Sequence, residues 1–268
     1  MTGIPPGPEL SRIDASVAHS ARFWNYLVGG KDNFAADREA AEQVLEVMPL
    51  VGVNARADRA FLGRAVRYLT AEAGIGQFLD IGTGIPTASN THEVAQAIAP
   101  EARVVYVDND PVVLVHARAL LTSTPQGATD YVDADLRDPG TILDAAAATL
   151  DLGKPVAIML LGILNFISDA EAPDQIVARL LDAVPAGSYL AISHPARDIE
   201  AVAMAEGARR WNRLSPAQLT LRTHAGVSRF FDGLDLLEPG VVPMNQWRPD
   251  PLDEHSGTVS QYGGVGRK

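Results

Sequence analysis

Three acids and two glycines stand where a small, positively charged ligand could be held. They are Asp80, Gly82, Gly84, Asp108 and Asp135. In the stretch FLDIGTGIPT (78–87) an apolar run ends in an acid and is followed by the two glycines. Glycine permits a tight turn and lets a ligand approach the backbone closely. A carboxylate at a strand end can accept both hydroxyls of a ribose in charge-assisted hydrogen bonds, which are strong.

The glycine turn differs from the dinucleotide-binding fingerprint. G-x-G-x-x-G seats a pyrophosphate on a helix N-terminus, and here the third glycine position holds Thr87. Pro86 suits the first turn of a helix, because its missing N–H would have no partner there. Asp80 also places a negative charge beside the loop, which opposes a diphosphate and favours a cation. A ligand with an amine, a sulfonium and a ribose but no phosphate fits better, and S-adenosylmethionine is such a ligand.

Further polar residues at strand ends extend this hypothesis. We expect Asn109 beside the adenine, Asp135 as an acceptor for the adenine amino group, and the Leu136 N–H near the ring edge. The structural alternative is that Asp108 caps a helix before Pro111 and that Asp135 is a turn residue. The ordered combination of acids at successive strand ends favours the ligand site.

The fourth strand and the residues that follow it, AIMLLGILNFI (157–167), are expected to face the methyl group that S-adenosylmethionine would transfer. Gly162 would allow close approach, and Asn165 could orient a substrate. His194, just past the fifth strand, is the candidate general base, since an imidazole titrates near neutrality. The preferred alternative is that His194 is a hydrogen-bonded strand-end residue before Pro195.

Five short apolar runs must position these residues. They lie at 77–81, 103–107, 129–132, 155–161 and 187–193. The runs are apolar rather than alternating, and helical segments separate them, as expected for parallel strands covered on both faces. Two further β-like stretches, 234–242 and 258–266, follow each other without a clear helix, which predicts an antiparallel hairpin at a sheet edge. The predicted fold class is therefore α/β, with a Rossmann-like doubly wound sheet.

The N-terminal part of the chain has a helical residue pattern and lacks the strand-like apolar runs. The predicted segments are a flexible leader at 1–10, an N-terminal helical extension at 11–73 and the main domain at 74–268. Breaks at 29–30 and 49–52 divide the extension into three helices, and Asn54 could cap the last one.

The stretch YLVGGKDNF (26–34) interrupts the helical pattern with a glycine pair and three polar residues. We interpret it as a shaped loop of a lid, in which Tyr26, Gly30 and Asn33 close the ligand site. The alternative is a polar turn between helices that uses glycine for its positive φ.

Composition and charge exclude several classes of protein. The 268 residues are 47% hydrophobic and 21% charged, as is typical of a globular chain, and no apolar run approaches the ~18–20 residues that span a bilayer. The start, MTGIPPGPEL, is no signal peptide, and the lack of cysteine excludes disulfides and thiolate metal sites, so we expect a cytoplasmic protein.

A net charge of −11 with scattered Lys and Arg argues against a nucleic-acid partner and favours a small-molecule substrate. His92 and His116 lack partners at metal-ligand spacing, so we predict no metal.

Residues 77–193 resemble the core of class I S-adenosylmethionine-dependent methyltransferases. From about residue 11 the whole chain is similar to a bacterial family of S-adenosyl methyltransferases once known as a domain of unknown function. The stretches that carry the resemblance are ARFWNYLVGGKDNFAADRE (21–39), NARADRAFLGRAVRYL (54–69), FLDIGTGIPT (78–87), VVYVDNDPVVLVHARALL (104–121), YVDADLRDP (131–139), RFFDGLDLLEPGVVPMNQWRP (229–249) and YGGVGRK (262–268).

The resemblance implies a seven-stranded sheet in the order 3-2-1-4-5-7-6, with strand 7 antiparallel. The residues that it implies at the cofactor are Asp80, Gly82 and Thr83 near the methionine part, Asp108 at the ribose, and Asn109, Asp135 and Leu136 around the adenine.

The functional hypothesis is methyl transfer from S-adenosylmethionine to a small-molecule acceptor, with S-adenosylhomocysteine as the product. One alternative is a non-catalytic S-adenosylmethionine sensor or partner-binding protein that kept the fold, because fold alone does not determine function. A third hypothesis is an NAD-dependent oxidoreductase, which the missing third glycine and Asp80 disfavour.

Overall fold

The apolar runs form the strands of one sheet. The structure is a computed structural model, and it describes residues 13–120, 122–250 and 257–268. The strands are β1 (Gln77–Ile81), β2 (Arg103–Asp108), β3 (Ala128–Asp133), β4 (Ala157–Leu161), β5 (Tyr189–Pro195), β6 (Asp235–Leu236), β7 (Val242–Pro243) and β8 (Gln261–Arg267). All five predicted runs are strands, displaced by at most two residues at either end.

The strand order is β3-β2-β1-β4-β5-β8-β6, with β7 also paired to β8. Strands β1 to β5 are parallel, and β8 lies antiparallel between β5 and β6. This confirms the predicted doubly wound order, in which the last strand of the chain inserts antiparallel before the preceding one. The predicted single strand at 234–242 is wrong in detail. It is divided into β6 and β7, because Pro239 has no N–H to donate and Gly240 turns the chain with a φ of 91°.

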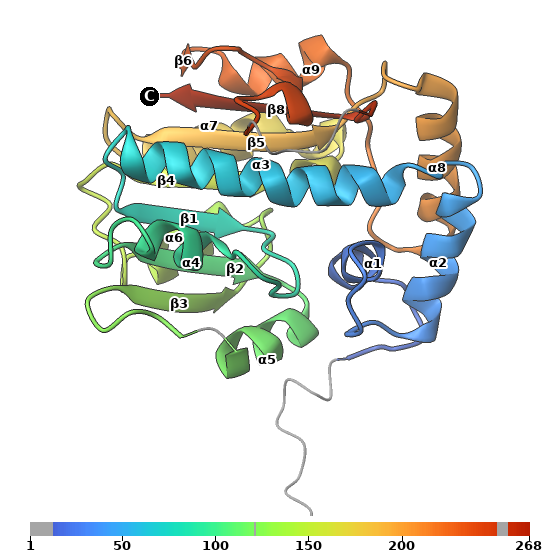
Figure 1. The fold of residues 1–268 in the computed structure, drawn as a ribbon, viewed down its shortest axis with the longest axis horizontal. Helices are drawn as coiled ribbons and strands as arrows, with labels where there is room; N and C mark the ends of the chain where they lie inside the picture. Colours follow the sequence, from blue (N-terminus) through green and yellow to red (C-terminus); the bar gives the residue numbers. More distant parts are fainter. Residues whose placement is uncertain (1–12, 121, 251–256) are drawn as a thin grey trace, which may run out of the picture.

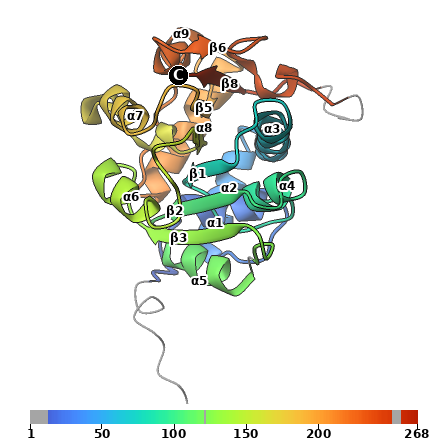
Figure 2. The ribbon, with the colours of Figure 1, turned by 90° about the vertical axis from the view of Figure 1, so that its left-hand side faces the viewer.

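Helices cover both faces of the sheet (Figures 1 and 2). The longer α-helices are α1 (Ser20–Leu27), α2 (Ala35–Leu45), α3 (Val51–Ala71), α5 (Pro111–Leu120), α6 (Pro139–Ala146), α7 (Pro173–Asp182) and α8 (Ala201–Leu214). Shorter helical segments are α4 (Thr91–Gln96), α9 (His224–Ser228), and the 3-10 helices η2 (Leu164–Phe166), η3 (Asp169–Glu171), η4 (Arg229–Phe231) and η5 (Met244–Gln246).

Successive residues of each central strand enter two separate cores. Phe78 packs with Phe61 and Leu69 of α3 on one face of the sheet, and its neighbour Leu79 packs with Ile142 of α6 on the other. This is the period of two that a strand requires, and both faces are apolar because both are covered. The continuous apolar runs in the sequence have this origin.

Helices α1, α2 and α8 lie beyond the carboxyl ends of the parallel strands, at the right of Figure 1. Helix α2 packs against both α1 and α8. The prediction that Asn54 caps the third helix is wrong. Helix α3 begins at Val51, Leu50 is its N-cap, and Asn54 lies within the first turn. The Asn54 Oδ1 instead accepts from the N–H of Ser260 at 3.1 Å. The predicted leader at 1–10 lies outside the described residues.

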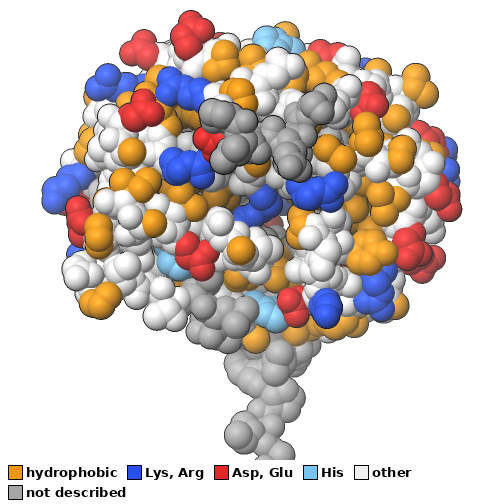
Figure 3. Space-filling model, in the orientation of Figure 1, with side chains coloured by type: hydrophobic (Ala, Val, Ile, Leu, Met, Phe, Trp, Pro, Cys, Tyr) orange, Lys and Arg blue, Asp and Glu red, His pale blue; other side chains and the backbone are white. Residues whose placement is uncertain are grey.

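The surface is mixed in charge. On the face shown in Figure 3, basic and acidic side chains are interspersed. No helix in the described ranges is both long and apolar enough to cross a membrane.

The glycines of β8 predict a measurable effect on stability. A Cβ on Gly266 would lie 2.9 Å from Cδ1 of the buried Phe231 ring, so Gly266→Ala should lower the unfolding free energy by about 1–3 kcal/mol through overpacking. A Cβ on Gly76 would meet no atom within 4 Å, and Gly76→Ala should change it by less than about 0.5 kcal/mol. Denaturant unfolding of the two variants beside the native chain measures both. Equal effects would contradict the packing described for β8.

Candidate functional site

The turn that leaves β1 is shaped by two glycines with left-handed backbone. Gly82 has a φ of 77° and Gly84 a φ of 66°. The Gly82 N–H donates to the carbonyl of Val107 on β2 at 2.8 Å, which holds the turn against the neighbouring strand. A Cβ on Gly82 would lie 2.7 Å from Ile163, whereas a Cβ on Gly84 would meet no atom within 4 Å. Glycine is therefore required at both positions by conformation, and at Gly82 also by close packing.

Asp108, the last residue of β2, holds this turn from the side. Its Oδ2 accepts from the Gly84 N–H at 2.9 Å, and its Oδ1 accepts from the Asp110 N–H at 2.9 Å. The residue is only 8% exposed, and this burial raises the pKa of its carboxyl although the two N–H groups act to lower it. Each carboxylate oxygen can accept more than one hydrogen bond, so both can still accept from a ligand.

A cavity lies against this turn, at the carboxyl ends of β1, β2 and β4 and beneath α1. We call it cavity A, and its volume is about 100 Å³. Its polar lining includes Asp58, Arg59, Asp80, Thr83 and Asp108. Gly162 also lines it, with a φ of 65° and no atom within 4 Å of a Cβ placed there.

Cavity A concentrates negative charge. Asp80 is 5% exposed, and burial raises its pKa to about 6 although the Thr91 hydroxyl donates to its Oδ2 at 2.5 Å. Burial likewise raises the pKa of Asp58, whose carboxylate accepts from the Ser193 hydroxyl on β5. Among the described residues that line cavity A, Arg59 is the single cation. An enclosed site with this charge balance favours a ligand that carries positive charge.

A second cavity, cavity B, continues from the first past the end of β2. Its volume is about 450 Å³, and it is lined by Asp135, Leu136 and Arg137 after β3. The Asn109 amide donates to Asp135 Oδ2 at 3.0 Å. Cavities A and B share the lining residues Ser20, Gly82, Asp108, Asn109, Ile163 and Phe166. The two cavities therefore adjoin, and Asp108 lies in the wall that they share.

Helix α1 forms the roof of cavity A. The helix contributes Ser20, Ala21, Trp24 and Asn25 to the lining, and Val28 directly after the helix also lines the cavity. These residues of the N-terminal segment are not the ones that the sequence analysis named for the lid.

The three lid residues predicted from the sequence lie behind this roof. Tyr26 faces α2 and donates its hydroxyl to Glu42 at 3.2 Å. The Asn33 amide donates to Asn25 Oδ1 at 2.9 Å. A Cβ on Gly30 would lie 2.2 Å from the Asn25 amide nitrogen. Gly30 and Asn33 therefore position Asn25 and leave it to line the cavity.

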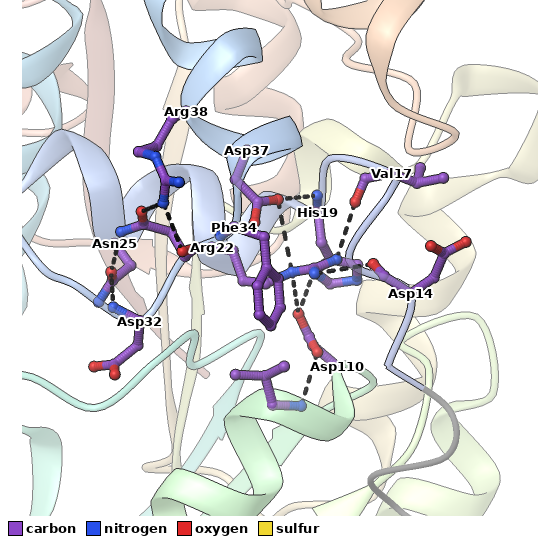
Figure 4. A network of polar contacts seen from close by, with 12 residues as sticks. Asp14, Val17, His19, Arg22, Asn25, Asp32, Phe34, Asp37, Arg38 and Asp110 are labelled. Atoms are coloured by element: carbon purple, nitrogen blue, oxygen red, sulfur yellow. Dashed lines mark hydrogen bonds and ion pairs between the residues drawn. The ribbon is translucent and has the colours of Figure 1, made fainter.

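A polar network fastens α1 to the end of β2 (Figure 4). His19 Nδ1 lies 2.9 Å from Asp110 Oδ2, and Arg22 Nε lies 3.4 Å from the same oxygen. Asp37 of α2 closes the network, because its Oδ1 accepts from the His19 N–H at 2.9 Å and lies 3.6 Å from Arg22 Nε. Asp110 is two residues beyond Asp108, so the same strand end carries both an acid that lines the two cavities and the anchor of the roof.

His194, the candidate base, is fully buried and lies outside the lining of cavities A and B. Its Nδ1 lies 2.9 Å from the Pro195 carbonyl, and its Nε2 lies 2.8 Å from Arg222 Nη1. Burial lowers its pKa to about 3, so the neutral ring donates from Nδ1 and accepts at Nε2. Both nitrogens are occupied by the protein, which agrees with the preferred alternative of a hydrogen-bonded strand-end residue. Asn165, the second candidate, lies in η2 behind cavity A.

Asp58 is the functional candidate that sequence reasoning missed. It stands three and four residues before the buried Phe61 and Leu62, on the apolar side of α3. An acid at that position of a helical repeat is the signal that could have identified it.

The chain was compared with known proteins. A family model described as S-adenosyl methyltransferase matches residues 7–268. The chain belongs to this family. The family description names an S-adenosyl methyltransferase, which confirms the predicted resemblance and, with it, S-adenosylmethionine as the predicted cofactor. None of the curated proteins matches the chain.

Solved structures agree with this family membership. A DUF574 family protein from Streptomyces avermitilis is 47% identical, has a TM-score of 0.93, and the match covers 96% of this chain and 100% of that one. A protein from Thermobifida fusca described as a "putative methyltransferase" is 40% identical, has a TM-score of 0.87, and is matched over 99% of each chain. A SAM-dependent methyltransferase from Anabaena variabilis is 12% identical with a TM-score of 0.52 over 95% of this chain and 97% of that one, which shows the fold alone.

The raised pKa of Asp80 predicts a pH dependence of stability. Between the unfolded value near 4 and the folded value of about 6, the folded chain binds more protons, so the unfolding free energy falls as pH rises through this window. At pH 7 the ionised carboxylate costs about 3 kcal/mol. Asp80→Asn should therefore gain stability relative to the native chain between pH 4 and pH 7, measured by denaturant unfolding at several pH values.

Thr91→Val tests the cause of this dependence. Loss of the hydroxyl that donates to Asp80 should move the upper edge of the window to higher pH. A stability difference between Asp80→Asn and the native chain that does not vary from pH 4 to pH 7 would contradict the assignment.

Proposed function

We propose that this chain transfers a methyl group from S-adenosylmethionine to a small-molecule acceptor. The observation that carries the proposal is the buried carboxylate of Asp108, which the Gly84 and Asp110 N–H groups hold in the wall common to cavities A and B. A fixed acid between a negatively charged cavity and a wider one matches a ligand with a ribose between a cationic end and a base.

The lining residues fit this cofactor part by part. Asp108 would accept the two ribose hydroxyls, one on each oxygen. Asp80 and Asp58 would face the ammonium and sulfonium charges, and Arg59 would be the counter-ion of the cofactor carboxylate. Asp135, Asn109 and Leu136 would surround the adenine in cavity B, whose lining includes all three.

When bound, the cofactor supplies an electrophilic methyl group on its sulfonium. The protein's part is to hold the acceptor in line with that group, and orientation of this kind contributes about 7–11 kcal/mol to lowering a barrier. Gly162 leaves space in the wall of cavity A where a larger residue would project. An acceptor that arrives protonated also needs a base to take its proton.

The roof over cavity A favours a small acceptor. Helix α1 covers the site, and its anchors His19 and Arg22 are tied to Asp110. The net charge of −11 further disfavours a polyanionic acceptor such as a nucleic acid.

The test is calorimetric titration with S-adenosylmethionine, S-adenosylhomocysteine and NAD. The two adenosyl ligands should bind the native chain, and NAD should not. Asp108→Asn should weaken adenosyl binding by about 30- to 1,000-fold, because two hydrogen bonds to a charged group are lost or distorted. Asp130→Asn is the matched control. Asp130 lies on β3, its Oδ2 accepts a hydrogen bond of 3.2 Å from the Thr149 hydroxyl, and it is not among the residues that line cavity A or cavity B.

Two outcomes would refute the proposal. One is the absence of adenosyl binding by the native chain, and the other is preference for NAD, which would restore the oxidoreductase hypothesis. An equal loss in Asp108→Asn and Asp130→Asn would show that Asp108 acts through stability and not through the ribose.

A further inference from the structure

A third cavity, cavity C, lies behind cavity A, between α1, α2, α8 and the ends of β5 and β8. Its wall is mainly apolar and includes four aromatic side chains: Phe23 and Trp24 of α1, Phe166 of η2 and Trp211 of α8. The Phe23 and Trp211 rings meet edge to face, with centroids 4.7 Å apart. No charged residue is among the described residues that line cavity C. A charged ligand there would be desolvated without a counter-ion, so the cavity suits an uncharged one.

Two buried polar side chains in this wall carry atoms that have no hydrogen-bond partner within the described part of the chain. Asn165 is 1% exposed and Gln261 is 2% exposed. Among the described residues, neither the Nδ2 nor the Oδ1 of Asn165 has a partner, and the Gln261 Oε1 has none. Buried polar groups are nearly always paired, and an unpaired one destabilises the fold. Asn54 lines the same cavity but follows the usual rule, since its Oδ1 accepts from the Ser260 N–H.

Cavity C is next to cavity A. Trp24 and Phe166 line both, so these two side chains form the partition between them. Asn165 follows Gly162 and Ile163 of cavity A by only two or three residues and lies on the other side of this partition. A molecule in cavity C would therefore reach the methyl-donating end of cavity A past Trp24 and Phe166.

On the basis of the proposed function, we propose that cavity C binds the methyl acceptor. The acceptor class is a small, uncharged, planar ring that carries a hydrogen-bond donor and an acceptor. The aromatic wall selects the ring. Asn165 can donate and accept at once, and the Gln261 Oε1 requires a donor, so the two together select an amide-like or hydroxyl-bearing edge.

Met48 controls the size of the cavity. The volume in the structure is about 50 Å³, which is less than the roughly 150 Å³ of a cavity that holds benzene. A ring therefore enters only if a wall residue moves. Met48 lies against α8, where a Cβ on Gly207 would be 2.0 Å from its sulfur, and its unbranched side chain is flexible enough to move aside.

The binding test uses three ring compounds of similar size, each titrated calorimetrically with S-adenosylhomocysteine present. Benzamide has a donor and an acceptor, acetophenone has the acceptor alone, and benzoate is charged at pH 7.5. Benzamide should bind at least about tenfold more tightly than either of the others. Asn165→Leu should weaken benzamide by about tenfold or more, and Met48→Ala should tighten it by enlarging cavity C. Quenching of Trp24 and Trp211 fluorescence reports occupation of the cavity independently.

Thermal unfolding of the ligand-free chain separates a binding role for Asn165 from a structural one. Asn165→Leu removes unpaired polar atoms and should leave the melting temperature unchanged or raise it. Asn54→Leu removes a paired amide from the same cavity and should lower it. Equal destabilisation by the two variants would overturn the inference.

Adenosyl binding distinguishes failure of this inference from failure of the proposed function. If the native chain binds S-adenosylhomocysteine but binds benzamide no better than benzoate, the assignment of cavity C is wrong and the cofactor site remains. If Asn165→Leu keeps adenosyl binding and loses benzamide, the acceptor assignment is supported. If the native chain binds neither S-adenosylmethionine nor S-adenosylhomocysteine, the proposed function itself is wrong.

Discussion

The end of β2 is the point on which the site depends. Asp108 accepts the N–H groups of Gly84 and Asp110, and Asp110 in turn holds His19 and Arg22 of the roof. One strand end therefore fixes the glycine turn on one side of the cavity and α1 on the other. Charge-assisted hydrogen bonds in a buried setting are strong, so the glycine turn and α1 are held in a fixed position relative to each other.

The same region carries a cost to stability. Asp58, Asp80 and Asp108 face one enclosed space, and burial raises the pKa of each. A fold selected for stability alone would not place three acids there beside a single arginine. Buried acids with raised pKa values that line one cavity favour a functional site there. The amide of Asn165 and the Oε1 of Gln261, which have no hydrogen-bond partner among the described residues, lie in the neighbouring cavity C.

Much of the architecture was predictable because local sequence carries it. Five apolar runs of strand length, separated by helical segments, can bury both faces only as a parallel sheet, and this sheet is observed. The acids and glycines follow from the same logic, because the carboxyl ends of neighbouring parallel strands meet at one edge. The glycines of YGGVGRK have a packing reason that only the structure shows: Phe61 and Phe231 contact β8 from opposite faces.

The sequence by itself determined the apolar strands and the acids and glycines at their ends, and hence the charge that a ligand must match, since each strand and its end residues are close together in the chain. Only the tertiary structure decided which α1 residues face the cavity, that Asn54 supports β8 instead of capping α3, and that His194 is occupied by Arg222. It also decided that Asp58 enters the site and that Asn165 and Gln261 meet in one apolar wall. These facts depend on contacts between segments more than 20 residues apart, and a periodic pattern states which face of a helix is buried but not what that face meets.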